Sequence, residues 1–263
     1  MAIVNTHYGF CAKGGAAVKF TYTGEYNVRD DGVVELLTNG TLVFLNPAVI
    51  DIFCVGGGGA GGLGVYSNDI LGGGGGAGGY TRTILRQAVS GSINVTIGAG
   101  AASKAENGGM TSFGSILSAN GGNSAVSSGI GGNGGSGGGG GVSNNSDYGT
   151  GGSDGSAGEK GFPASLKGGT GQGTTTREFG ESTGKLYAGG GGGGRYLYGR
   201  IIASIGGAGG GGSGAADAYT TAQPATAGVA NTGGGGGGGT SYTGRRQPGA
   251  PGGSGIVCFR AAK

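Results

Sequence analysis

Six tracts of almost pure glycine constrain the fold of this chain more than any other feature. Only single Ala, Ser or Asn residues interrupt them, and together they carry most of the 77 glycines of the 263-residue sequence. The tracts span residues 56–62, 72–79, 131–141, 189–194, 206–212 and 233–239. Glycine-rich segments are usually flexible linkers. The segments between these tracts are too short to be folded domains, so a set of linkers would have little to connect.

An extended left-handed helix of the polyproline II type is the ordered alternative to linkers. It rises about 3.1 Å per residue and leaves the backbone N–H and C=O groups pointing sideways. Without side chains, such helices can approach closely enough to hydrogen-bond to one another in a bundle. A collagen triple helix is excluded, because it needs glycine at every third residue and abundant proline, and this chain has 5 prolines and no triplet repeat. Disordered tracts and a packed glycine bundle both stay open at this point.

The rest of the composition argues against several classes of protein. Charged residues make up 11% of the chain, whereas disordered chains usually carry many charges. The net charge of +3 is small and scattered, so no nucleic-acid partner is expected. No apolar run approaches the length that a membrane span needs, so no membrane insertion is expected. The opening sequence MAIVNTHYGF has no basic segment followed by an apolar one, so no secretory signal peptide is expected.

The segments outside the tracts carry the alternating pattern of β-strands. Val18, Phe20 and Tyr22 alternate with polar residues, as in a strand with one buried face. Strands are expected at about 17–55, 80–97, 110–119, 174–187 and 256–260, the fourth region being a hairpin that turns at about residues 181–184. We therefore expect a mainly β fold, with one glycine-rich domain over residues 17–263 and a short segment, 1–16, before it.

A turn signal and a proline divide the first strand region. Asn39 and Gly40 lie between the apolar runs 34–37 and 41–44, and an Asn-Gly pair in this setting is a strong signal for a β-hairpin. Pro47 follows, and it is expected to end the second strand of that hairpin. A separate strand is then expected at residues 50–55, directly before the first glycine tract.

Tyrosine and arginine concentrate in the linkers that lie farthest from the expected strands. Because several tracts lead straight out of a strand or back into one, linkers between an outgoing and a returning tract must lie at the far end, whereas 213–232 is expected nearer the strands. Tyr and Arg are enriched at protein interfaces and in antibody loops. The candidate receptor-binding residues are Tyr66, Tyr148, Arg195, Tyr196, Tyr198, Arg200, Tyr242, Arg245 and Arg246.

Signals for catalysis or cofactor binding are weak. His7 is the single histidine, and no Cys and His residues cluster at zinc spacing. The GxGxxG matches are trivial in glycine homopolymer, and none precedes Lys-Ser or Lys-Thr as a phosphate-binding loop requires. No catalytic residues, metal or cofactor are therefore expected. Cys54 and Cys258 lie in apolar strands, where buried free thiols are expected, although pairing between them stays open.

The order of strands and tracts resembles the glycine-rich domain of phage and prophage tail proteins. The resemblance is carried by IDIFCVGGGGAGG, GGGGGAGGYTRTIL, INVTIGAG, GGMTSFG, KLYAGGGGGG and GGSGIVCFR. The pattern is also similar to the extracellular glycine-rich domain of anaplastic lymphoma kinase and to the distal tail-fibre adhesins of T-even-like phages. The resemblance implies a β-sandwich or jelly-roll base, a bundle of polyproline II-type glycine helices (polyglycine II), and receptor recognition by distal loops.

The resulting functional hypothesis is a non-enzymatic receptor-binding protein, or adhesin, at the tip of a phage or prophage tail fibre. Its expected partners are a protein or glycan of the host cell surface and, through residues 1–16, a tail-fibre or baseplate protein. Its expected location is the virion tail, or outside the cell after release. Two alternatives are a structural subunit of a fibre or filament, whose loops contact other copies in a homo-oligomer, and an enzyme acting on cell-surface polymers.

Overall fold

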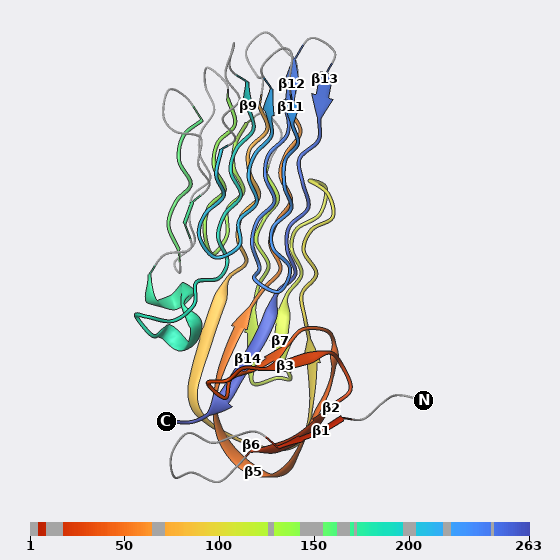
Figure 1. Cartoon of the computed structure of the whole chain (residues 1–263), viewed down its shortest axis with the longest axis vertical. Helices are drawn as coiled ribbons and strands as arrows, with labels where there is room; N and C mark the ends of the chain where they lie inside the picture. Colours follow the sequence, from red (N-terminus) through yellow and green to blue (C-terminus); the bar gives the residue numbers. More distant parts are fainter. Residues whose placement is uncertain are drawn as a thin grey trace.

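The protein has a sheet at one end and long extended segments that run from it to the other end (Figure 1). The computed structural model describes residues 5–8, 18–64, 72–125, 129–142, 155–161, 169–170, 173–196, 204–217, 222–242 and 245–263. Within these residues the fold is mainly β, and the two 3-10 turns are its only helical segments. No helix in this part of the chain is long and apolar enough to cross a lipid bilayer.

A nine-stranded sheet forms the first end, which we call the base. All its strand pairs are antiparallel, and its order is β3-β4-β14-β5-β6-β7-β8, with β2 pairing to both β1 and β5. The strands are β1 (Asn5–Tyr8), β2 (Lys19–Tyr22), β3 (Tyr26–Val28), β4 (Val34–Leu36), β5 (Gly40–Val55), β6 (Thr81–Thr96), β7 (Thr111–Phe113), β8 (Leu117–Ala119) and β14 (Ile256–Ala261).

The sheet curls around an apolar core because the long strand β5 has two different neighbours on one side. Its first half pairs with β2, as at Phe20 and Phe44, and its second half pairs with β14. Phe20 and Phe44 then meet Phe259 of β14 edge to face, with ring centroids 5.3 and 6.0 Å apart. All three rings are buried, so this aromatic cluster holds the two halves of the curled sheet together.

The expected hairpin about Asn39 and Gly40 does not form. Strand β4 pairs with β3 and β14, whereas β5 pairs with β2, β14 and β6, so the two strands that flank the Asn-Gly pair are not neighbours. The Asn39 side chain instead accepts a hydrogen bond from the backbone N–H of Ile97 at 2.6 Å. All three residues of β4 are buried, which favours a place inside the sheet over an edge position in a local hairpin.

Pro47 does not end a strand either, because β5 continues through it. The pairing of β5 with β6 shifts register between Phe44 and Ala48, so the proline lies in an irregular part of the ladder. Proline lacks a backbone N–H and is tolerated in strands at bulges of this kind. A second register shift lies between Ile50 and Ile52.

Residues 173–188, which we call the arm, pack against the second face of the sheet. A strand was expected at 174–179, but the structure has the 3-10 turns η1 (Thr174–Thr176) and η2 (Glu178–Gly180) there. Of the strand pairing expected in this hairpin, the structure has one antiparallel bridge, between Arg177 and Leu186. Phe179 adopts a left-handed backbone conformation (φ 53°), and its buried ring packs on Phe53 at 6.2 Å, so tertiary packing outweighs the local strand pattern.

The glycine tracts lie side by side and hydrogen-bond to one another, forming what we call the glycine array. Within tract 72–79, every third N–H donates to the same neighbouring tract. These bonds run from Gly73, Gly76 and Gly79 to the carbonyl oxygens of Gly239, Gly236 and Gly233, at 2.7 to 2.9 Å. The Gly76 carbonyl also accepts a bond from Gly191, and a Cβ at Gly76 would collide with the Gly59 carbonyl oxygen. The close approach of these backbones therefore requires glycine.

In two of the six glycine tracts, the chain reverses direction within the tract. In tract 131–141, the N–H groups of Gly132 and Gly135 donate to carbonyl oxygens of tract 72–79 with both chains running in the same direction. The carbonyl oxygens of Ser136 and Gly139 then accept from tract 72–79 with the chains running in opposite directions. The chain therefore turns between Gly135 and Ser136. Tract 206–212 turns at residues 208–210, where two glycines have φ values of 94° and 97°. These turns supply additional segments to the array.

Five short strands end the array at the far end, opposite the base (Figure 1). They are β9 (Arg195–Tyr196), β10 (Ala216–Asp217), β11 (Ala222–Gln223), β12 (Thr240–Tyr242) and β13 (Arg245–Gln247). Strand β10 pairs with β9 and β11, and β12 pairs with β13. Segment 213–232, expected near the base, instead contains the β10–β11 pair of the far end and returns to a turn at residues 230–233.

Candidate functional site

The far end brings together residues from three separate glycine tracts. Gly194 precedes β9 and lies against Gly239, which precedes β12, so these two strands begin side by side. Gly72 also forms a bridge with Thr240 at the start of β12. The array thus brings strands that are distant in sequence to one end of the molecule.

Five of the nine candidate residues lie on these far-end strands. Arg195 and Tyr196 form β9, Tyr242 ends β12, and Arg245 and Arg246 begin β13. Tyr242 and Arg245 are directly opposite each other in the β12–β13 pair. The remaining candidates lie outside the described residues; they are Tyr66, Tyr148, Tyr198 and Arg200.

The two described arginine side chains at the far end have different environments. Arg246 is exposed to solvent, whereas Arg195 is half-buried. Burial lowers the pKa of the Arg195 guanidinium, since desolvation disfavours its charge. Among the described side chains, which do not include that of Asp217, no ion pair joins either arginine to a carboxylate.

Sequence reasoning missed the contribution of β10 and of Ser204. Asp217 on β10 is paired with Tyr196 on β9, which places one acidic residue among the basic ones. Ser204 is buried, and within the described chain its Oγ is the buried side-chain oxygen without a hydrogen-bond partner. Ser204 lies in segment 195–205 and Asp217 in segment 213–232, and neither segment has a pattern from which these positions could be inferred.

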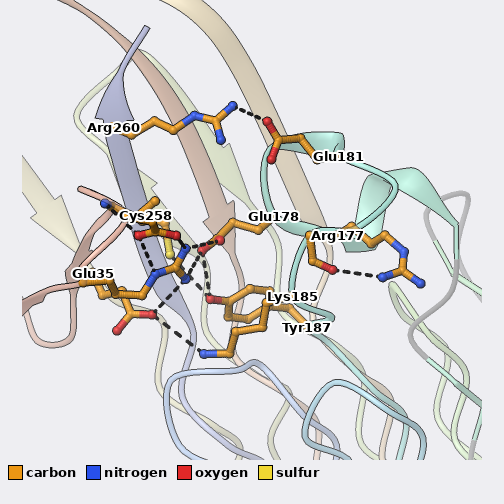
Figure 2. Close-up of polar contacts among 12 residues, drawn as sticks. Glu35, Arg177, Glu178, Glu181, Lys185, Tyr187, Cys258 and Arg260 are labelled. Carbon is orange, nitrogen blue, oxygen red and sulfur yellow. Dashed lines mark hydrogen bonds and ion pairs between the residues drawn. The ribbon is translucent and has the colours of Figure 1, made fainter. Parts of the chain in front are cut away.

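A second polar cluster lies where the arm meets the base (Figure 2). Arg29 makes two hydrogen bonds to the Glu178 carboxylate, at 2.9 and 2.7 Å, and two to Asp31, at 3.1 and 2.7 Å. Glu35 accepts a longer bond from Arg29 at 3.4 Å. Glu178 is buried, so its pairing with Arg29 offsets the cost of removing its charge from water.

Three potential metal ligands lie within this cluster, but the guanidinium of Arg29 already supplies the positive charge that pairs with its two carboxylates. Ligand atoms of Glu35, Glu178 and Cys258 all lie within 4.8 Å of one another. Burial raises the pKa of the Cys258 thiol, so the thiolate that metals bind is disfavoured. The Tyr187 hydroxyl donates to Glu178 at 3.1 Å and lies 3.7 Å from the Cys258 sulfur. We assign this cluster a structural role, joining the arm to the sheet.

A further ion-pair network fastens the arm to the C-terminal strand. Arg260 donates to Asp51 at 3.1 Å and to Glu181 at 2.7 Å, and its guanidinium lies 4.1 Å from the Phe179 ring centroid. Lys263 adds a bond to Glu181 at 2.9 Å. These bonds lower the pKa of Glu181 to about 2. The arm is therefore held by charge pairs at two points.

The two described cysteines do not form a disulfide. Cys54 and Cys258 lie on neighbouring strands, but the first belongs to the core inside the curled sheet and the second to the core beneath the arm. Their side chains point to opposite faces of the sheet. Burial raises the pKa of both thiols, so the thiolate form that reacts is disfavoured.

Hollows in the described surface hold no paired acid and base. A hollow of about 530 Å³ lies where β2 and β14 diverge along β5, and its lining includes Val18, Pro47 and Val49. A second, of about 520 Å³, is lined by Lys104 and several asparagines. A third, of about 620 Å³, is lined mainly by hydroxyl and small apolar residues of β6, β7 and the turn after it.

Comparison with known proteins identifies the type of domain. A family model described as a glycine-rich domain matches residues 38–262, which covers most of the chain from the start of β5 to the C-terminal strand. No curated protein matches the sequence.

Proposed function

The chain belongs to the glycine-rich domain family, and on this premise we propose that it is a non-enzymatic adhesin of a phage or prophage tail. Its far end would recognise a protein or glycan of the host cell surface, and its base would join the tail fibre or baseplate. The observation that carries the proposal is the gathering of Arg195, Tyr196, Tyr242, Arg245 and Arg246 at one end of a side-chain-free scaffold.

We further propose that the glycine array is a polyglycine II bundle. A helix with three residues per turn returns its N–H to the same direction at every third residue. The bonds from Gly73, Gly76 and Gly79 to one neighbouring tract have this period. A second row has it too, from Gly72, Gly75 and Gly78 to another neighbour. The base would then be a sandwich or jelly-roll, as the curl of the sheet around its aromatic core favours.

In the proposed role, the base attaches the protein and the far end recognises the host, and the glycine array separates the two. The first described strand, β1, and the last, β14, both belong to the base, so both described ends of the chain lie away from the far end. We propose that segment 1–16 contributes to attachment and that the protein acts in the virion tail. Rigidity of the array would keep the recognition strands at a fixed distance from the fibre.

Binding to intact cells tests this proposal. The purified full chain, labelled with a fluorophore, is mixed with intact cells from a panel of bacterial species, and bound protein is measured by flow cytometry. The Tyr196→Ala/Tyr242→Ala/Arg246→Ala variant is expected to lose binding to any species that the wild type binds. Arg82→Ala is the matched control, because Arg82 is an exposed arginine of the base.

Two outcomes would overturn the proposal. One is a folded triple variant that binds cells as well as the wild type, which would remove the far end from recognition. The other is a wild type that binds no species of a broad panel. Circular dichroism on each variant checks that the fold is retained.

A structural fibre subunit is the second candidate, and one observation favours it. Leu45, Val49 and Leu85 on β5 and β6 of the base are 52, 47 and 56% exposed. Exposed apolar side chains on neighbouring strands are typical of protein contact surfaces. Self-association through them predicts a concentration-dependent oligomer in light scattering, which Leu45→Ser/Val49→Ser should abolish. A wild type that stays monomeric would exclude this role.

A further inference from the structure

The far-end strands carry an excess of positive charge. Among the residues of β9 to β13, Arg195, Arg245 and Arg246 are basic and Asp217 is acidic. These residues lie on strands that the array brings to one end of the molecule. Arginine presents five donors in a planar fork that fits phosphate and carboxylate groups.

Comparison with the base shows why this charge points to a ligand. There, Arg29 is bound by three carboxylates and Arg260 by two, so the protein itself neutralises these two half-buried arginines, whereas half-buried Arg177 of the arm donates to the Gly184 carbonyl. At the far end, half-buried Arg195 has no carboxylate partner among the described side chains, which do not include that of Asp217. A desolvated charge without a partner is costly, and such groups concentrate at binding sites.

A buried hydroxyl lies on a neighbouring segment of the array. The Ser204 carbonyl accepts a bond from Gly214 and lies against Gly192, three residues before Arg195. Its Oγ has no hydrogen-bond partner in the described chain although the residue is only 4% exposed. Buried polar atoms are nearly always paired, so this hydroxyl is an unpaired group of the described chain beside the segment that leads to Arg195.

We propose that the ligand of the far end is an anionic polysaccharide, bound through its phosphate or carboxylate groups by Arg195, Arg246 and the neighbouring Arg245. The inference deepens the proposed function and rests on it, because it names the chemistry of the surface that the adhesin recognises. Charge-assisted bonds from arginine would supply the orientation, and the excess of positive charge would speed the encounter with a negatively charged cell surface.

Direct binding to defined polymers tests the inference. The full chain is titrated with polygalacturonate, which carries carboxylates, with a phosphorylated mannan, and with neutral dextran, at low and high NaCl. Binding to one or both polyanions, with no binding to dextran and a loss at high salt, is expected. Binding of the phosphomannan alone would assign phosphate as the recognised group, and binding of polygalacturonate alone would assign carboxylate.

Variants then locate the binding. Arg246→Gln should weaken polyanion binding on the order of tenfold, as expected for loss of one charge-assisted contact. Arg195→Gln should weaken it at least as much, whereas Arg195→Lys, which keeps the charge but not the planar fork, should restore part of it. Arg82→Gln makes the same charge change at the base and should leave binding unchanged.

The outcomes separate this inference from the proposed function. Wild-type binding to cells that persists at high salt, together with no binding to either polyanion, would overturn the anionic ligand and leave the adhesin role intact; a surface protein would then be the receptor. Equal losses from Arg82→Gln and Arg246→Gln would also overturn it, because they would show attraction by net charge alone. Polyanion binding that depends on Arg246, without binding to any cells, would support the ligand chemistry and overturn the adhesin role.

Discussion

The base and the glycine array exclude water by opposite means. In the base, large side chains such as Phe20, Ile52 and Phe259 fill the space inside a curled sheet. In the array, backbone hydrogen bonds join most neighbouring segments directly, and few side chains lie between them. Burial of apolar area stabilises the first region, whereas the second combines a satisfied backbone with close packing and must offset the large conformational entropy of glycine. The difference predicts which substitutions each region tolerates.

Deletion of a core ring should have the largest effect. Phe259→Ala removes a buried ring that contacts both Phe20 and Phe44, and we expect a loss of about 4 kcal/mol in the free energy of unfolding, from lost burial and the cavity left behind. Chemical denaturation measures it. A loss below about 1 kcal/mol would show that the base does not depend on its aromatic core.

Addition of one methyl group to the array should cost nearly as much. The new Cβ of Gly76→Ala would overlap the backbone carbonyl oxygen of Gly59, which cannot rotate away, and we expect a loss of about 3 kcal/mol. Ile52→Val is the matched one-carbon change in the base, with an expected cost of about 1 kcal/mol. Equal costs for the two changes would contradict the contrast between the regions.

Removal of one charge where the arm meets the base should have an intermediate effect on stability. Glu178→Gln leaves Arg29 without its bidentate partner, and we expect a loss of about 2 kcal/mol, since Glu178 is buried and Arg29 partly exposed. Hydrogen exchange should report faster opening of the arm. If exchange in the arm is unchanged while the rest of the protein is destabilised, the pair does not fasten the arm.

Acid should slightly weaken the ion pairs that join Glu181 of the arm to Arg260 and Lys263. The pKa of Glu181 is lowered from an ordinary value of 4.5 to about 2 by Arg260 and Lys263, so its stabilising contribution is full above about pH 4.5 and is lost as the pH falls toward 2. Solvent screens this partly exposed carboxylate, so we expect less than about 1 kcal/mol. Thermal unfolding from pH 5 to pH 2 measures it, and Glu181→Gln should flatten that dependence relative to the wild type.

The strand pattern of the base was largely readable, but its pairing was not. The alternation at Val18, Phe20 and Tyr22 correctly predicts β2. The Asn39-Gly40 signal was wrong because it is local, whereas the Asn39 side chain is used by Ile97, far along the chain. Pro47 was misread because a register shift accommodates it within β5.

The position of some candidate residues at the far end was predictable, whereas the path of the chain that brings them there was not. Concentrations of Tyr and Arg between glycine tracts correctly pointed to one end of the molecule for Arg195, Tyr196 and Arg246. The turns inside tracts 131–141 and 206–212 could not be predicted, because glycine accepts either conformation and homopolymer contains no signal for a reversal. Segment 213–232 was consequently placed at the base, and β10 with Asp217 was missed.

The sequence by itself determined where the chain has no side chains, and hence which segments can approach one another at the distance of a backbone hydrogen bond. It also determined which few residues project from the ends of those segments. Only the tertiary structure decided which tract lies beside which, and that Arg29 meets Glu178 while Arg195 meets no described carboxylate. The reason is physical: a glycine backbone offers the same donors and acceptors at every residue, so its partners are selected by the chain as a whole.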